Sequence, residues 1–159
     1  MAGLLLPALL CAALGLAAAF ATKRTQWIGM VSLAGVACIT ALFHFPLDWK
    51  DKILVAGWGS LMVTALSVLI PTRLSAWLVL SLAVNAGFWT GALMAVTAQP
   101  RDLAFALPLV LVAFPARWAL TTPMRLGVKV IAGWLIAVAI LGAGVSMLPT
   151  PGYKRDHVE

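Results

Sequence analysis

Long uncharged stretches alternate with short charged ones along the whole chain. Charged residues gather at 23–24, 48–52, 73, 101–102, 117–129 and 154–159. A helix needs about 20 apolar residues to cross the hydrocarbon core of a bilayer. The pattern therefore predicts about six transmembrane helices, at residues 2–21, 26–47, 53–70, 74–98, 103–120 and 126–148.

Each span is expected to be helical, because in hydrocarbon every backbone amide and carbonyl must be satisfied within its own segment. Short segments of alternating polarity, which would indicate a transmembrane β-barrel, are absent. The predicted fold is all-α: a polytopic helical bundle forming one domain at residues 1–148, followed by a short polar tail at 149–159. The fifth span contains Pro108 and Pro115, which are expected to kink it or end it early.

Composition agrees with a multi-pass membrane protein. Of 159 residues, 63% are hydrophobic and 10% are charged, and the mean hydropathy is +1.04. Soluble domains carry about 25% charged residues. No positive charge precedes the first apolar segment, so we interpret it as a transmembrane helix and not as a signal peptide. We expect the protein in a prokaryotic inner membrane.

Six spans would place both chain ends on the same side of the membrane. The connections on that side carry every acidic residue of the chain, whereas the opposite side carries basic residues alone. Cytoplasmic loops are enriched in Lys and Arg. We therefore expect the termini outside and the purely basic face in the cytoplasm.

The side chains that usually support catalysis or metal binding are scarce. No Asp or Glu falls inside a predicted span, Cys11 and Cys38 lie within spans, and His44 and His157 are the only histidines. A zinc site needs three or four ligands, and ion-coupled transporters usually carry carboxylates within the membrane. We therefore predict no catalytic residue, no metal site and no evident cofactor apart from bound lipid. An enzyme is not favoured, and no motif indicates nucleic-acid binding.

A short motif occurs twice. The segments "FPLDWKDKILVAGW" and "FPARWALTTPMRLGVKVIAGW" both run from Phe-Pro-x-x-Trp to Ala-Gly-Trp, between spans two and three and between spans five and six. An offset of three helices would invert the second copy, as in a 3+3 inverted repeat. Pro at helix ends and Trp at the headgroup layer explain each copy equally well. On either interpretation, we expect His44, Trp49 and Trp118 at the membrane interfaces.

The fourth span holds the most polar side chains. Gly87 and Gly91 form a Gly-x-x-x-Gly motif that predicts close helix packing. A Leu at Gly87 is therefore expected to disturb packing far more than a Leu at Ala92, which we expect to face lipid. A possible intramembrane polar site comprises Ser81, Asn85 and Thr90. The Asn85 amide needs a partner in hydrocarbon, either on another helix or on a substrate.

A basic rim is expected around the start of the sixth span. Arg117, Arg125 and Lys129 lie near predicted span ends, where long basic side chains can extend to water. We expect this rim to bind lipid phosphate or an acidic loop of a partner.

Two functions from different classes fit these features. The first is an accessory or assembly subunit of a larger membrane complex, acting through contacts with lipids and with other subunits or further copies of itself. The second is a small-molecule permease or channel built on the inverted repeat.

Overall fold

The computed structural model describes residues 2–43, 45–46, 49–69, 74–97, 106–120 and 125–147. Within them the chain forms six α-helices and one 3-10 helix and no strand, which confirms the predicted all-α class. The elements are α1 (Ala2–Ala19), α2 (Lys23–Ala41), α3 (Lys50–Leu69), α4 (Ala76–Thr97), η2 (Leu107–Val112), α6 (Ala113–Leu120) and α7 (Arg125–Met147).

Three helix ends differ from the predicted ones, and local chemistry accounts for two of them. The second helix starts at Lys23 instead of residue 26, because the Thr22 side chain accepts a hydrogen bond from the Thr25 amide and caps the helix. The same helix ends at Ala41, well before residue 47. The third helix starts at Lys50 and takes three charged residues into its first turn, where the Asp51 carboxylate is favourably placed near the helix N-terminus.

The fifth predicted helix is interrupted, as its prolines suggested. Pro108 lies in the first positions of η2, and the Ala113 amide donates to the Val110 carbonyl where η2 passes into α6. Pro115 has no amide hydrogen to continue an α-helical hydrogen-bond series into η2. Of the predicted span 103–120, residues 103–105 lie outside the described part.

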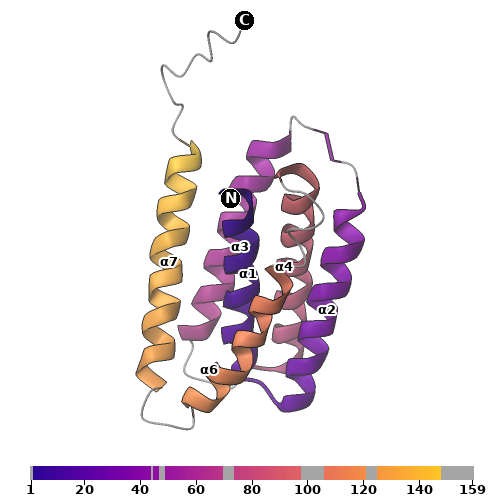
Figure 1. Cartoon of the computed structure of the whole chain (residues 1–159). Helices are drawn as coiled ribbons and strands as arrows, with labels where there is room; N and C mark the ends of the chain where they lie inside the picture. Colours follow the sequence, from indigo (N-terminus) through magenta and orange to yellow (C-terminus); the bar gives the residue numbers. More distant parts are fainter. Residues whose placement is uncertain are drawn as a thin grey trace, which may run out of the picture.

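The helices run up and down the bundle (Figure 1). The start of α1, the end of α2, the start of α3 and the ends of α4 and α7 lie together, at what we call the Lys50 end. The opposite end, here the Arg117 end, holds the starts of α2, α4 and α7 and the end of α6. Helix α1 lies in the middle and packs against α3, α4, η2 and α6, whereas α2 packs mainly on α4 and α7 mainly on α3.

Small residues allow these close contacts. A Cβ added at Gly15 of α1 would lie 2.8 Å from the Val110 carbonyl oxygen of η2. On α7, a Cβ at Gly142 would lie 2.5 Å from Cε2 of Trp58, so the indole of α3 rests on the α7 backbone. Such distances are too short for a real side chain, and glycine is therefore required at both crossings.

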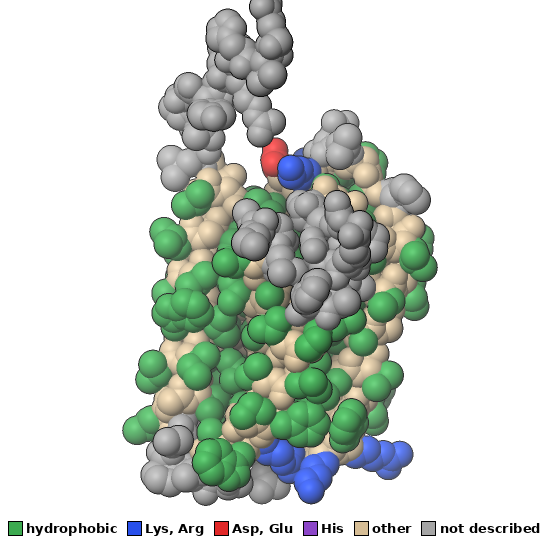
Figure 2. Space-filling model, in the orientation of Figure 1, with side chains coloured by type: hydrophobic (Ala, Val, Ile, Leu, Met, Phe, Trp, Pro, Cys, Tyr) green, Lys and Arg blue, Asp and Glu red, His purple; other side chains and the backbone are tan. Residues whose placement is uncertain are grey.

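Three helices of the described part are long and apolar enough to cross a membrane: Lys50–Leu69, Ala76–Val96 and Leu126–Met147. Shorter apolar helices cover Leu5–Ala19 and Leu107–Leu120. Figure 2 shows apolar side chains over the middle of the bundle, with Lys and Arg gathered at its two ends. This distribution supports a membrane protein with at least three spans.

The two halves of the chain pack differently. Helix α1 packs extensively against α3, but among the described residues α4 and α7 form no contact of comparable extent. The two Ala-Gly-Trp segments also differ, because Trp58 is 8% exposed and Trp134 is 59% exposed. Other contacts do match. In a 3+3 inverted repeat, the contact between α2 and α4 corresponds to the contact of η2 and α6 with α1, and both contacts are present. The inverted repeat therefore remains a hypothesis.

Candidate functional site

A small polar network lies halfway along α4. The Asn85 side-chain amide donates to the Ser60 hydroxyl of α3 at 2.6 Å, and the Trp89 indole donates to the Asn85 side-chain oxygen at 3.2 Å. Asn85 is nine residues from the start of α4, which corresponds to about 14 Å along the helix axis. A hydrocarbon layer about 30 Å thick that is spanned by α4 would therefore have this network near its middle.

This network is on the outside of the bundle, between two grooves. One groove, of about 650 Å³, lies beside α2, and the other, of about 410 Å³, lies beside α3. Asn85, Ser81 and Trp89 line both grooves. We call this surface the α4 face and define it by the residues Trp77, Leu80, Ser81, Val84, Asn85, Phe88 and Trp89.

The α4 face combines exposed aromatic rings with unused hydrogen-bonding capacity. Trp77 is 80% exposed, and Phe88 packs edge-on against Trp89 with ring centroids 5.1 Å apart. An Asn side chain has two N–H donors and an oxygen with two lone pairs. The two hydrogen bonds of Asn85 use half of that capacity, while the Ser81 hydroxyl donates to the Trp77 carbonyl of its own helix at 2.8 Å.

The glycine motif of α4 packs against α2, next to the groove that Val36 lines. A Cβ at Gly87 would lie 2.8 Å from the Leu33 carbonyl oxygen, and one at Gly91 would lie 2.5 Å from the Ala37 carbonyl oxygen. The expectation that Ala92 faces lipid is wrong, because Ala92 is fully buried. Thr90 is buried as well, so it is not part of the polar surface formed by Ser81 and Asn85.

The predicted basic rim is only partly described. Arg117 is half-buried and donates to the Ala21 carbonyl at 2.8 Å and to the Gln26 side chain at 3.5 Å, so it holds α6 against the connection between α1 and α2. Lys129 is half-buried in α7. Arg125 begins α7, but its side chain lies outside the described part. Lipid binding by this rim remains a prediction.

The interfacial residues are at the helix ends. Trp49 precedes α3 at the Lys50 end and Trp118 lies in the last turn of α6 at the Arg117 end, and both are exposed. His44 lies outside the described residues. Any up-and-down arrangement of these helices places Trp49 and Trp118 at opposite ends. Their placement therefore does not support the inverted repeat.

Several important residues were not identified from the sequence. Ser60 supplies the hydrogen-bond partner of Asn85, and Gln26 is buried at the Arg117 end with a side-chain nitrogen that has no hydrogen-bond partner. The only indication for Ser60 was its position as a polar residue within an apolar run. Nothing in the sequence indicates that it faces Asn85.

The described part of the chain contains no group of three or more His, Cys, Asp or Glu side chains that could hold a metal ion. Comparison with known protein families, curated proteins and solved structures gives no match for this chain, so its function has to be inferred from its own residues.

Proposed function

We propose that this protein is an accessory or assembly subunit of a larger membrane complex, and that the α4 face binds a transmembrane helix of its partner. The observation that carries this proposal is the half-buried Asn85 amide, which lines two grooves at the middle of α4. A polar group facing lipid at that depth is unfavourable, whereas one that bonds across helices stabilises their association.

The shape of the α4 face supports a helical partner. Grooves on both sides of α4 are lined by aromatic and aliphatic side chains, with the polar atoms of Ser81 and Asn85 between them. A partner helix laid along this surface would bury the rings of Trp77 and Phe88 and offer a hydrogen bond to Asn85. Buried aromatic anchors usually carry most of the binding energy at protein interfaces.

We further propose six membrane crossings. Helix α4 ends at the Lys50 end and α7 starts at the Arg117 end, so the chain between them has to pass from one end to the other. Its described part, Leu107–Leu120, extends by about 12 Å of 3-10 helix and about 12 Å of α-helix. That length approaches the thickness of the hydrocarbon core.

Helix α2 is proposed as a crossing because of its exterior. Large apolar side chains cover its outer side, among them Trp27, Val31, Ile39 and Leu42, all more than half exposed. Its only charged residues, Lys23 and Arg24, are in its first turn at the Arg117 end. A surface of this kind is stable in lipid and would be unfavourable in water. Residence in a prokaryotic inner membrane remains a prediction.

Site-specific photo-crosslinking tests the partner surface. A photoreactive amino acid replaces Phe88 in one variant and Trp134 in the control, both exposed and both near the middle of their helices. On irradiation in native membranes, we expect a discrete heteromeric adduct from position 88 and none from position 134. Equal adducts from both positions, or none from 88, would contradict the proposed surface.

The permease alternative has one supporting observation, the matching placement of α2 on α4 and of η2 and α6 on α1. It predicts a homo-oligomer that carries solute across liposome membranes without other subunits. Adducts from position 88 that contain only this chain, together with autonomous flux, would favour it over the accessory subunit.

A further inference from the structure

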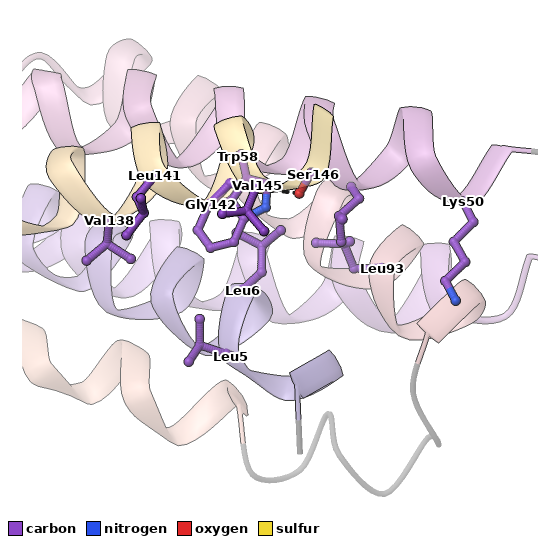
Figure 3. A pocket seen from close by; sticks show the side chains of 11 residues that line it. Leu5, Leu6, Lys50, Trp58, Leu93, Val138, Leu141, Gly142, Val145 and Ser146 are labelled. Carbon is purple, nitrogen blue, oxygen red and sulfur yellow. Dashed lines mark hydrogen bonds between the residues drawn. The ribbon is translucent and has the colours of Figure 1, made fainter. Parts of the chain in front are cut away.

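An apolar pocket of about 550 Å³ lies on another side of the bundle, where α7 meets α1 and α3 (Figure 3). The α7 side chains Val138, Leu141 and Val145 form one wall, and α1 and α3 form the other. Trp58 lies against Gly142 within this lining. The complete lining is Leu5, Leu6, Lys50, Leu54, Trp58, Leu93, Val138, Leu141, Gly142, Val145 and Ser146.

The polar side chains of this pocket lie towards one end. Lys50 lines the pocket from the first turn of α3, at the Lys50 end of the bundle, and Ser146 is one residue from the end of α7. Among the residues that the structure describes, no carboxylate forms an ion pair with Lys50. The first turn of α3 adds the partial positive charge of a helix N-terminus. The charge of Asp51 is adjacent, but Asp51 does not line the pocket.

The dimensions of the pocket limit its occupant. From Lys50 to Trp58 the α3 wall rises by about 12 Å, close to the thickness of one hydrocarbon leaflet. An acyl chain is much narrower than a helix, which is about 10 Å wide with its side chains. Flexible acyl chains are thin enough to enter.

We propose that this pocket binds an anionic phospholipid, with its acyl chain between α3 and α7 and its phosphate at Lys50. The apolar walls select a hydrocarbon chain, and the cation at the mouth selects a negatively charged headgroup. Such a site would fill the space between α7 and the rest of the bundle. The site is separate from the α4 face and does not depend on the proposed partner.

Native mass spectrometry of protein exchanged into vesicles of phosphatidylglycerol and phosphatidylcholine in equal amounts tests this site. We expect retained lipid to favour phosphatidylglycerol in the unaltered chain. In Lys50→Gln that preference should fall by about fivefold, the effect of about 1 kcal/mol for one basic residue near an anionic surface. Lys52→Gln removes the same charge outside the pocket and should leave the preference unchanged.

A second pair of variants tests the acyl-chain site. Val145→Trp places a large ring in the pocket wall, whereas Ile140→Trp places the same ring on the exposed surface of α7 outside the lining. We expect Val145→Trp to lower retention of both lipids and Ile140→Trp to retain them, with both variants keeping the thermal stability of the parent.

Three outcomes would overturn the proposal. They are equal retention of the two lipids by the unaltered chain, equal effects of the two Lys variants, and equal retention by the two Trp variants. Crosslinking from position 88 is expected to survive all four substitutions, so a failed lipid site is distinguishable from a failed partner surface.

Discussion

At the scale of single residues, glycines that look alike in the sequence have unlike surroundings. Gly142 and Gly144 are two residues apart on α7, yet only Gly142 touches another helix. A Cβ there would overlap the Trp58 ring, whereas a Cβ at Gly144 would meet nothing within 4 Å. The packing of α7 on α3 therefore depends on the absence of one methyl group.

The first prediction concerns this pair. Gly142→Ala should lower the free energy of unfolding by about 1–3 kcal/mol, the usual cost of overfilling a packed contact. Gly144→Ala should be neutral or slightly stabilising, because alanine favours the helix without a clash. Thermal unfolding in a mild detergent measures both. Equal midpoints would mean that Trp58 does not rest on α7.

The second prediction concerns Arg117, whose guanidinium donates to the Ala21 carbonyl. Arg117→Met keeps much of the apolar stem but removes this charged hydrogen bond, which should lower stability by about 1.5–3 kcal/mol. Arg24→Met removes the same charge from an exposed position on α2 and should change stability by less than about 0.5 kcal/mol. A comparable loss in both variants would indicate that general surface charge matters and that the bond to Ala21 does not.

At the scale of helices, the sequence predicted the all-helical class and the approximate extent of the long helices, because uncharged length indicates where such helices lie. Residues 74–98 and 126–148 differ from α4 and α7 by no more than two residues at either end. Local chemistry moved the other boundaries, through the Thr22 cap and the charged first turn of α3. The predicted boundaries were based on the lengths of uncharged apolar runs, and such lengths contain no information on either effect.

Apart from the glycine side of α4, the side of each helix that faces its neighbours could not be predicted. A helix in lipid is apolar on its inner and outer sides alike, so the periodicity that marks the buried side of a soluble helix is lost. The incorrect expectation for Ala92 has this cause. Asn85 could be singled out because it is polar, but its partner Ser60 is fixed by the packing of α3 on α4.

The third prediction concerns the contact between α2 and α4. Gly91→Leu should prevent close approach, because even a Cβ at Gly91 would lie 2.7 Å from the Thr40 Cβ and 2.5 Å from the Ala37 carbonyl oxygen. Gly35→Leu adds the same side chain to α2 where nothing lies within 4 Å. We expect poor assembly and a lower unfolding temperature for Gly91→Leu alone. Similar behaviour of the two variants would show that α4 does not pack through Gly91.

At the scale of the whole molecule, the charges separate the two ends of the bundle. In the described part, the Arg117 end carries basic side chains without an acidic one, and the Lys50 end carries Asp51 between two lysines. The sequence predicted this separation from the order of its charged segments. It also places the proposed lipid phosphate and the predicted basic rim at opposite ends of the bundle.

The last prediction tests the six-span arrangement by the sidedness of single cysteines. In a background with Cys11→Ala and Cys38→Ala, Arg24→Cys and Lys129→Cys should react with an impermeant thiol reagent from one side of sealed vesicles, because both residues lie at the Arg117 end. Lys52→Cys should react only from the other side. The comparison of positions 52 and 129 decides how many times the intervening chain crosses. Helices α3 and α4 together return the chain to its starting side, so Lys129 can lie opposite Lys52 only if the segment containing Leu107–Leu120 also crosses. Labelling of Lys52→Cys and Lys129→Cys from the same side would remove that crossing and reduce the count to fewer than six.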